Sequence, residues 1–329
     1  MFDAFEEYLD YLKWDQAAAD ATIQKREQTL RKFSTWLRDE QDVTAIESVS
    51  RRDIGRYVDY LVEEGYAPNT ITAGYYSSVS AVFNWAHSDG VIDENPIDRL
   101  KRQAIKKRAR EALSEEEKKN ELGGKDFLEK EVVYELAEHA PEPSARNELL
   151  IKLMFWTGVR VSELVGITIG DDGQIDGPNS DIDPEEPRIT VYAPKTDKPR
   201  VVSYPRSEIN PLMRDWVSHG RLRYKHADEL NYLFIGHKGE FTKSGVADVV
   251  TQAAENAGLQ EVKRVGKDGK EYNLVTPHLL RHSHAMYYHN EEGVPLDRLK
   301  DHLGHHSVDT TERFYAENTP EKMVDTFGE

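Results

Sequence analysis

Apolar residues recur every three or four positions through the first part of the chain, the spacing that gathers them on one face of an α-helix. The first stripe comprises Leu30, Phe33, Trp36 and Leu37. A second helix is predicted to begin at Ser50, because Asp53 stands where the second partner of a capping box belongs. Its expected buried stripe comprises Ile54, Tyr57, Val58, Leu61 and Val62.

A third helix is predicted from Pro68-Asn69 to a stop at Gly90. Its apolar side comprises Ile71, Tyr75, Val79, Val82, Phe83 and Ala86. The dipeptide Asn95-Pro96 then breaks the helical pattern. We therefore expect residues 1–100 to form a small, wholly helical domain.

The pattern changes within the second part of the chain, residues 113–329. Apolar residues alternate in two short runs around the turn-forming sequence PKTDKP of residues 194–199, which predicts a β-hairpin between about Arg188 and Tyr204. Helical spacing occupies the remainder, at residues 147–156, 161–165, 244–257, 277–290, 295–303 and 310–315. The predicted fold class is mainly α, with a small β-hairpin or sheet in the C-terminal domain.

The amino-acid composition indicates where in the cell the protein is expected. The chain has no cysteine, so it cannot form disulfides or thiolate metal sites, which suits a cytoplasmic protein. It begins without the basic and apolar stretches of a signal peptide. No apolar run approaches the ~18 residues of a membrane helix. We expect a cytoplasmic protein without a membrane partner.

The charge allows two interpretations. Sixty acidic residues against 43 basic ones give a net charge of −17, and such a protein would ordinarily avoid nucleic acid. Alternatively, the carboxylates keep a halophilic, haloarchaeal-type protein soluble in concentrated salt while local basic patches meet DNA.

One basic run favours the second interpretation. Residues 101–112 separate the two predicted domains and are expected to form an interdomain linker. A charge run is commonly a solvated surface, but in so acidic a chain contact with a polyanion explains it better. The candidate DNA-binding residues are Lys101, Arg102, Lys106, Lys107, Arg108 and Arg110. By contrast, the acidic stretch 170–187 lacks the regular ligand order of a calcium loop, and we expect it to be disordered.

Candidate chemistry lies in the second domain. Arg160 follows a Thr-Gly break with Glu163 three residues later, and His278 and Arg281 share a helical face. The further candidates are Lys195 in the hairpin turn, His305 and Tyr315. Arginine forks neutralise phosphate oxygens, tyrosine can act as a nucleophile, and lysine or histidine can protonate a leaving group. The set suits phosphoryl transfer. A histidine metal site is the alternative, but no carboxylate or cysteine set completes one.

The segments TGVRVSEL, APKTDKPR, HLLRH and LGHHSVDTTERFY resemble, in this order, the conserved boxes of the tyrosine recombinase (phage integrase, Xer-type) family. The sequence PNTITAGYYSSVSAVFNWAHSDGVIDENP is similar to the family's helical, SAM-like core-binding domain. The resemblance covers nearly the whole chain. It implies a core-binding domain followed by a tyrosine recombinase catalytic domain.

The resemblance also implies residue roles. Arg160 and Arg281 would clamp the scissile phosphate, with Glu163 orienting the first arginine or a histidine. Lys195 would be the general acid for the 5′ oxygen. Tyr315 would attack phosphorus to give a 3′-phosphotyrosine. His278 would assist as acid or base, and His305 would donate a hydrogen bond to the phosphate. The family requires neither metal nor ATP, so no cofactor is expected.

The register of the nucleophile departs from the family pattern. In many relatives the tyrosine stands one position earlier, where this chain has Phe314. This keeps a catalytically inactive DNA-binding relative open as an alternative, and a type IB topoisomerase as another. The implied partners of a recombinase are double-stranded DNA with specific recombination sites, and a homotetramer or paired recombinase assembled on it through a Holliday junction.

Overall fold

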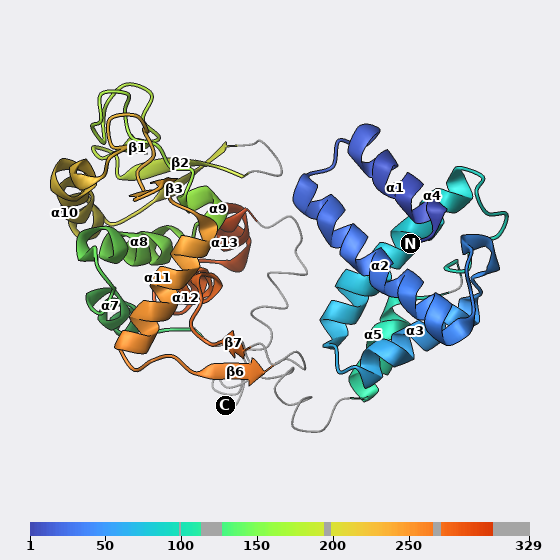
Figure 1. The fold of residues 1–329 in the computed structure, drawn as a ribbon. Helices are drawn as coiled ribbons and strands as arrows, with labels where there is room; N and C mark the ends of the chain where they lie inside the picture. The colour runs from blue at the N-terminus through green and yellow to red at the C-terminus, as the bar shows by residue number, and fades with distance from the viewer. Residues whose placement is uncertain (99, 113–126, 194–198, 266–270, 305–329) are drawn as a thin grey trace, which may run out of the picture. The chain divides into compact units, whose positions relative to one another are not determined.

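The computed structural model describes residues 1–98, 100–112, 127–193, 199–265 and 271–304. The predicted site residues Lys195, His305 and Tyr315, and the last predicted helix, lie outside these residues. The chain divides into two compact units, Met1–Gly123 and Gly124–Glu329 (Figure 1). Each unit has its own buried apolar core.

The first unit is helical. Its elements are α1 (Asp3–Trp14), α2 (Asp20–Gln41), the 3-10 turn η1 (Ile46–Ser48), α3 (Arg51–Glu63), the π-helix η2 (Thr70–Tyr76), α4 (Ser77–Ser88) and α5 (Arg102–Glu111). The predicted capping box is present, since Asp53 N donates to Ser50 Oγ and Ser50 N donates to Asp53 Oδ2 at 2.9 Å. The third predicted helix is divided between η2 and α4.

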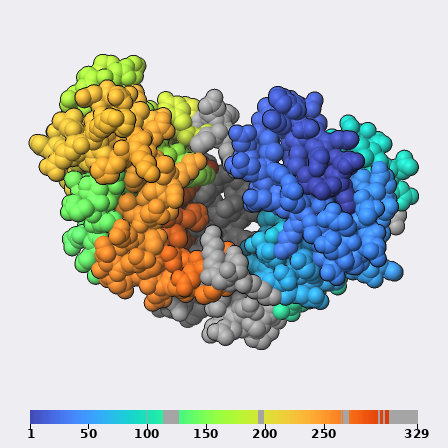
Figure 2. Space-filling view, viewed as in Figure 1, coloured from blue at the N-terminus to red at the C-terminus, as the bar shows by residue number. Residues whose placement is uncertain are grey.

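Aromatic rings fill the core of the first unit. Phe33 is fully buried and lies 4.6 Å from Tyr57 and 6.4 Å from Phe83, measured between ring centroids. Phe5, on α1, stacks on Phe33 at 6.2 Å. The predicted stripe of α2 therefore faces this core, and α1 covers it from another side. In the space-filling view, α1 and α2 form much of the visible face of this unit (Figure 2).

Helix α5 belongs to the first unit. The basic run predicts a linker at residues 101–112, but Ile105 and Ala109 are buried in the core of the first unit. Both stand on one helical face, so burying them fixes α5 against α3 and η2. The basic residues occupy the rest of the helix surface.

Helix α8 is the centre of the second unit. From Leu149 to Thr157 every residue of α8 is buried except Lys152, which is half-buried. Around it lie α7 (Lys130–Glu138), α10 (Arg206–Asp215), η3 (Trp216–Gly220), α11 (Lys243–Asn256) and α12 (Pro277–Asn290). Helix α11 lies on the visible face of this unit (Figure 2). The remaining helical elements are α9 (Val161–Leu164), η4 (Arg221–Arg223) and α13 (Leu296–Leu303).

The described residues of the second unit also form three small antiparallel sheets. The largest has the order β1 (Ile182–Asp183), β2 (Arg188–Tyr192) and β3 (Pro199–Ser203), with Val191 paired to Arg200. The others are β4 (Ile235–Gly236) with β5 (Gly239–Glu240), and β6 (Val262–Val265) with β7 (Glu271–Asn273). The predicted hairpin is confirmed as β2–β3.

The disorder expected for residues 170–187 is wrong. Asp181 Oδ2 accepts hydrogen bonds from the amide of Thr168 at 2.8 Å and from its hydroxyl at 2.7 Å. Ile175 and Ile182 are buried in the core of the second unit. These two apolar anchors among the acidic residues, together with backbone hydrogen bonds to the carboxylates, order the segment.

The described residues contain no group of three or more His, Cys, Asp or Glu side chains placed to hold a metal ion. None of the helices described here is both long and apolar enough to cross a membrane.

Candidate active site

The break after α8 places Arg160. Helix α8 ends at Thr157, and Gly158 follows with φ +61°, a left-handed conformation that glycine adopts without strain. An added Cβ at Gly158 would also stand 2.5 Å from a ring carbon of His284. The chain therefore turns sharply here, and Arg160 becomes the N-cap of α9.

Glu163 is the anchor of the site. Its side chain is fully buried, and it accepts hydrogen bonds from the Arg160 amide at 2.7 Å and from Arg160 Nη1 at 3.0 Å. Its other contacts are Arg200 Nη2 at 2.7 Å and Arg281 Nη1 at 3.9 Å. Burial raises the pKa of Glu163, but the hydrogen bond from the Arg160 amide and the charge of Arg200 together lower it by more. The net pKa therefore lies below its usual value.

Arg281 lies at the same centre on α12 and is 4% exposed. Its Nη1 donates to the carbonyl of Gly158, and its Nη2 donates to the carbonyl of Leu303. Burial and the nearby Arg160 charge lower the pKa of Arg281 to about 9, against the opposing effect of Glu163. Arg281 therefore remains charged at neutral pH.

Arg200, on β3, is a site residue that the sequence analysis missed. Besides its bond to Glu163, its Nη1 donates to the carbonyl of His302. Burial lowers the pKa of Arg200, while Glu163 raises it. The alternation of side chains along the predicted strand could have identified it. Val202 faces the core, so Arg200, two positions earlier, points to the same side.

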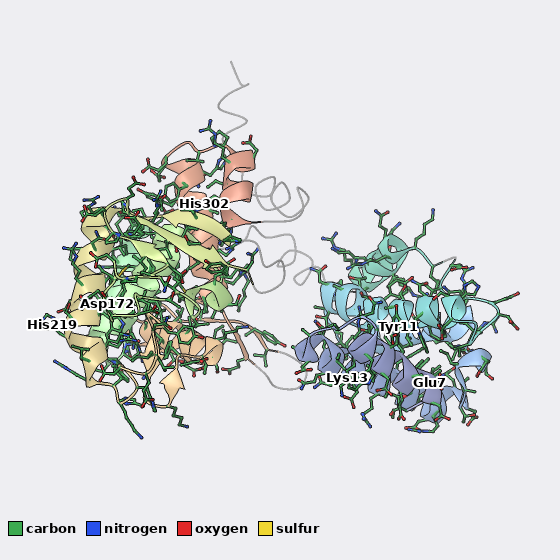
Figure 3. The ribbon with its side chains drawn as sticks, turned by 90° about the horizontal axis from the view of Figure 1, so that it is seen from above. Glu7, Tyr11, Lys13, Asp172, His219 and His302 are labelled. Atoms are coloured by element: carbon green, nitrogen blue, oxygen red, sulfur yellow. The ribbon has the colours of Figure 1, made fainter. Side chains whose placement is uncertain are left out.

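The end of α13 meets all three guanidinium groups. The carbonyls of His302, Leu303 and Gly304 accept from Arg200, Arg281 and Arg160 respectively, the last at 2.9 Å. The final carbonyls of a helix have no partner within the helix and carry its negative dipole end. The arginines supply both the missing donors and the opposite charge. Figure 3 marks His302 at this end of α13.

The centre carries an excess of positive charge. Three guanidiniums surround one carboxylate, within a chain of net charge −17. The Arg160 side chain is 37% exposed, so this cation reaches the surface. Such a centre can bind a phosphodiester and stabilise the additional charge that develops as the phosphorus is attacked.

His278 stands near the start of α12, one helical turn before Arg281, and is exposed. The helix begins at Pro277, after Thr276 caps it by accepting from the Leu279 amide at 3.3 Å. The structure thus brings Arg160, Glu163 and Arg281 together and places His278 on the helix that carries Arg281.

A buried histidine, His284, and a half-buried one, His302, lie close to Arg200 and Arg281. His284 Nδ1 is 2.7 Å from the carbonyl of Phe155, and its ring stacks on that of His302 at 5.2 Å. Burial and the neighbouring His302 lower the pKa of His284 to about 3. Burial and the charge of Arg200 lower the pKa of His302, while a hydrogen bond to the Thr157 carbonyl opposes them. Both rings are therefore neutral near pH 7.

The candidate DNA-binding residues form the polar surface of α5. Arg108 Nη2 is 2.6 Å from Asp59 Oδ2 on α3, and Lys107 Nζ is 3.7 Å from Glu111. Exposed members of the set are Lys101, Arg102, Lys107 and Arg108, and the half-buried members are Lys106 and Arg110.

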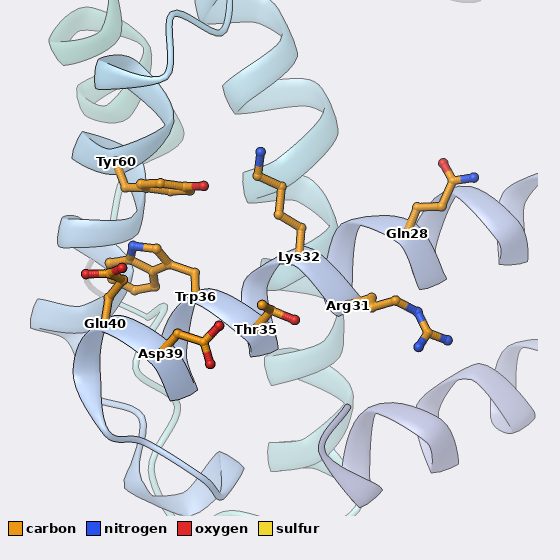
Figure 4. A pocket seen from close by; sticks show the side chains of 8 residues that line it. All are labelled: Gln28, Arg31, Lys32, Thr35, Trp36, Asp39, Glu40 and Tyr60. Atoms are coloured by element: carbon orange, nitrogen blue, oxygen red, sulfur yellow. The ribbon is translucent and has the colours of Figure 1, made fainter. Parts of the chain in front are cut away.

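A hollow of about 410 Å³ lies on α2 in the first unit (Figure 4). Arg31 and Lys32 line it together with Asp39 and Glu40. Lys32 Nζ lies 5.5 Å from the Tyr60 ring centroid. The opposite charges balance, and none of the candidate catalytic residues lines the hollow.

Replacing Glu163 by glutamine should destabilise the second unit. The variant leaves three guanidiniums without their counter-charge, and we expect the free energy of unfolding to fall by ~3 kcal/mol in denaturant titrations. The control is Glu186→Gln, because Glu186 is 69% exposed and pairs with Arg188 at 2.7 Å. An exposed pair contributes less than ~1 kcal/mol. Equally small losses in both variants would contradict the anchoring role.

The histidine pair predicts acid sensitivity. Unfolded histidine has a pKa near ~6.5, so the unfolded chain binds protons before the native chain does, and stability falls as pH drops below that value. His284 alone should account for ~2 kcal/mol between pH 6.5 and 5. Thermal unfolding of His284→Phe, which keeps a ring but cannot titrate, should depend less on pH. The exposed His219→Gln variant should behave as wild type; identical pH profiles for all three would refute the effect.

Comparison with known protein families agrees with this geometry. The model of the Phage integrase family matches residues 126–322, and that of the phage integrase N-terminal SAM-like domain matches residues 5–118. The tyrosine recombinase XerD of Halalkalibacterium halodurans is 23% identical over 327 residues, covering 98% of this chain and 95% of that protein. A tyrosine recombinase XerC of a Roseiflexus species is 27% identical over 316 residues, covering 95% and 88%.

Solved structures share the architecture. The XerH site-specific recombinase bound to its palindromic difH substrate superposes with a TM-score of 0.70 at 19% identity, covering 94% of this chain and 80% of that one. The Tn1549 transposon integrase in complex with transposon right end DNA gives 0.71 at 19% identity, covering 99% of both chains. The predicted fold class is confirmed. The family match spans the whole arginine centre, and the chain therefore belongs to the phage integrase family.

Proposed function

We propose that this protein is a site-specific DNA recombinase that cleaves and rejoins duplex DNA through a 3′-phosphotyrosine. The observation that carries the proposal is the convergence of Arg160 and Arg281 on the buried Glu163. Two arginines held in place before substrate arrives are preorganised for a charged transition state. The names of the curated relatives support the same class of enzyme.

Arg160 and Arg281 bind the non-bridging oxygens of the scissile phosphate. A guanidinium has five N–H donors. The carboxylate of Glu163 and the carbonyl of Gly304 engage two different nitrogens of Arg160, which leaves N–H groups for a phosphate. Because these guanidiniums supply positive charge at the phosphate, charge neutralisation does not require a metal ion.

Tyr315 forms the new bond to phosphorus, and the bond from phosphorus to the 5′ oxygen breaks. Lys195 donates the proton that the 5′ oxygen needs. His278 exchanges a proton as acid or base, and His305 donates to a phosphate oxygen. Because the phosphotyrosine retains the energy of the broken bond, a 5′ hydroxyl can reverse the step without ATP.

Double-stranded DNA bearing specific sites is the proposed partner. The XerH neighbour is bound to palindromic difH substrate and the Tn1549 integrase neighbour to transposon right end DNA, which supports this choice. We further propose that four protomers, or paired recombinases, assemble on this DNA and exchange strands through a Holliday junction. A cytoplasmic location fits this substrate and the absence of cysteine from the sequence.

The nucleophile is testable by covalent trapping. Full-length protein is incubated with nicked genomic DNA of its host, denatured and digested, and the nucleotide-linked peptide is identified by mass spectrometry. We expect an adduct on Tyr315 that Tyr315→Phe abolishes and that Tyr272→Phe, which changes an exposed tyrosine on β7, retains. Sequencing the attached DNA gives the target site.

Other outcomes identify the alternatives. DNA binding without an adduct would favour the inactive DNA-binding relative, for which Phe314 at the usual tyrosine position is the specific observation. Adducts at unrelated sequences, with relaxation of supercoiled plasmid, would favour a type IB topoisomerase.

The α5 residues should contribute phosphate contacts. Each phosphate contact adds ~0.9 to the slope of log affinity against log salt concentration. Replacing both Arg102 and Lys107 by glutamine should therefore reduce the slope by up to ~2 for a random-sequence duplex, measured by fluorescence anisotropy. The matched control replaces Lys225 and Lys238, exposed residues of the second unit, by glutamine. An unchanged slope in the α5 variant would remove α5 from the DNA interface.

A further inference from the structure

Arg200 occupies a special position in the β2–β3 hairpin. It pairs with Val191, and the next pair towards the turn is Tyr192 with Pro199, both exposed. Arg200 and Val191 are therefore the last inward-facing pair before residues 194–198. Lys195 precedes Arg200 by five positions.

The contacts of Arg200 tie this end of the hairpin to the arginine centre. Its Nη2 donates to Glu163 on α9, and its Nη1 donates to the His302 carbonyl on α13. A Cβ added at Gly304 would stand 3.3 Å from Arg200 Nε, so the backbone approaches the guanidinium closely. One side chain thus joins three elements.

Fold stability alone does not account for an arginine at this position. The side chain is 16% exposed, and its Nε is buried with no hydrogen-bond partner among the described residues. Burying a charged group is costly, and an aliphatic residue would suit the strand as Val202 does. Glu163 already has Arg160 and lies near Arg281. The arginine is therefore better explained by what it holds in place.

We infer that Arg200 is a positioning residue that fixes the hairpin carrying the general acid relative to the phosphate clamp. The inference rests on the proposed function, because it takes Lys195 as the donor to the 5′ oxygen. A general acid must lie within hydrogen-bond reach of the atom it protonates. Fixing strand β3, at a point five residues after Lys195 in sequence, to the residues that hold the phosphate serves this requirement.

A sulfur substitution isolates this role. In a duplex of the sequence recovered by covalent trapping, sulfur replaces the bridging 5′ oxygen at the cleaved bond. Tyr315 still bonds to phosphorus, but the leaving group departs as a thiolate. Thiols ionise near ~8.5, whereas an alkoxide, with a conjugate acid near the ~15.7 of water, needs a proton. Cleavage of the sulfur substrate is therefore independent of the general acid.

We expect Arg200→Gln and Arg200→Lys to cleave the oxygen substrate ~10²-fold more slowly than wild type, the effect of a small misplacement of a catalytic group. On the sulfur substrate both should return to within a few-fold of wild type. Lys195→Ala should show the same rescue, whereas Arg160→Ala should be slow on both substrates. Arg188→Gln, a change of an exposed arginine on β2, should match wild type throughout.

The outcomes separate the inference from the proposed function. Equal losses on both substrates would show that Arg200 serves the clamp or the fold, and would overturn the positioning role. Wild-type rates on the oxygen substrate would overturn it too. If wild type binds the duplex but cleaves neither substrate, the proposed function fails, and the inference fails with it. Thermal unfolding of each variant identifies losses that come from misfolding.

Discussion

One buried carboxylate connects the polar centre of the second unit. Glu163 would be very unfavourable as a lone charge in this position, and the three guanidiniums would repel one another without it. Arg160, Arg200 and Arg281 come from the start of α9, from β3 and from α12. Because all three guanidiniums need the same carboxylate, α9, β3 and α12 are fixed relative to one another. A single salt bridge would fix only two of these elements.

The end of α13 uses the same arginines for a second purpose. A helix that stops in the protein interior must satisfy its last carbonyls. Here the donors are the charged groups of the site, so the same contacts stabilise the helix end and hold the arginines. Gly304, at φ +65°, lets the chain leave the helix beside Arg200. The segment that contains the proposed nucleophile begins immediately after it in sequence.

The sequence predicted those parts whose signal is local. Helix α12 has the predicted bounds of 277–290, because Thr276 caps it and Pro277 suits its first turn. The capping box at Ser50 and the β2–β3 hairpin are local in the same way. The packing of α5 was missed because only two apolar residues, Ile105 and Ala109, stand among six basic ones.

The composition of the site required tertiary information. Recognisable sequence motifs contain Arg160, Glu163 and Arg281. The role of Arg200, by contrast, depends on which face of its strand meets α9 and α13, and no local sequence pattern predicts that face. The order of residues 170–187 depends likewise on Asp181 meeting Thr168 across a loop. Ordinary composition rules favoured disorder there, and long-range contacts decided otherwise.

Salt acts differently on the acidic surface of the chain and on its cationic arginine centre. Exposed carboxylates act over long distances, but salt screens them within ~10 Å at 0.1 M and within ~3 Å at 1 M. Glu163 and Arg281 are buried, and buried pairs are screened much less. As salt rises, repulsion between the acidic surface and a polyanion therefore weakens faster than the attraction at the arginine centre. The net charge of −17 is thus compatible with phosphate binding, provided that binding depends on short-range contacts with fixed arginines.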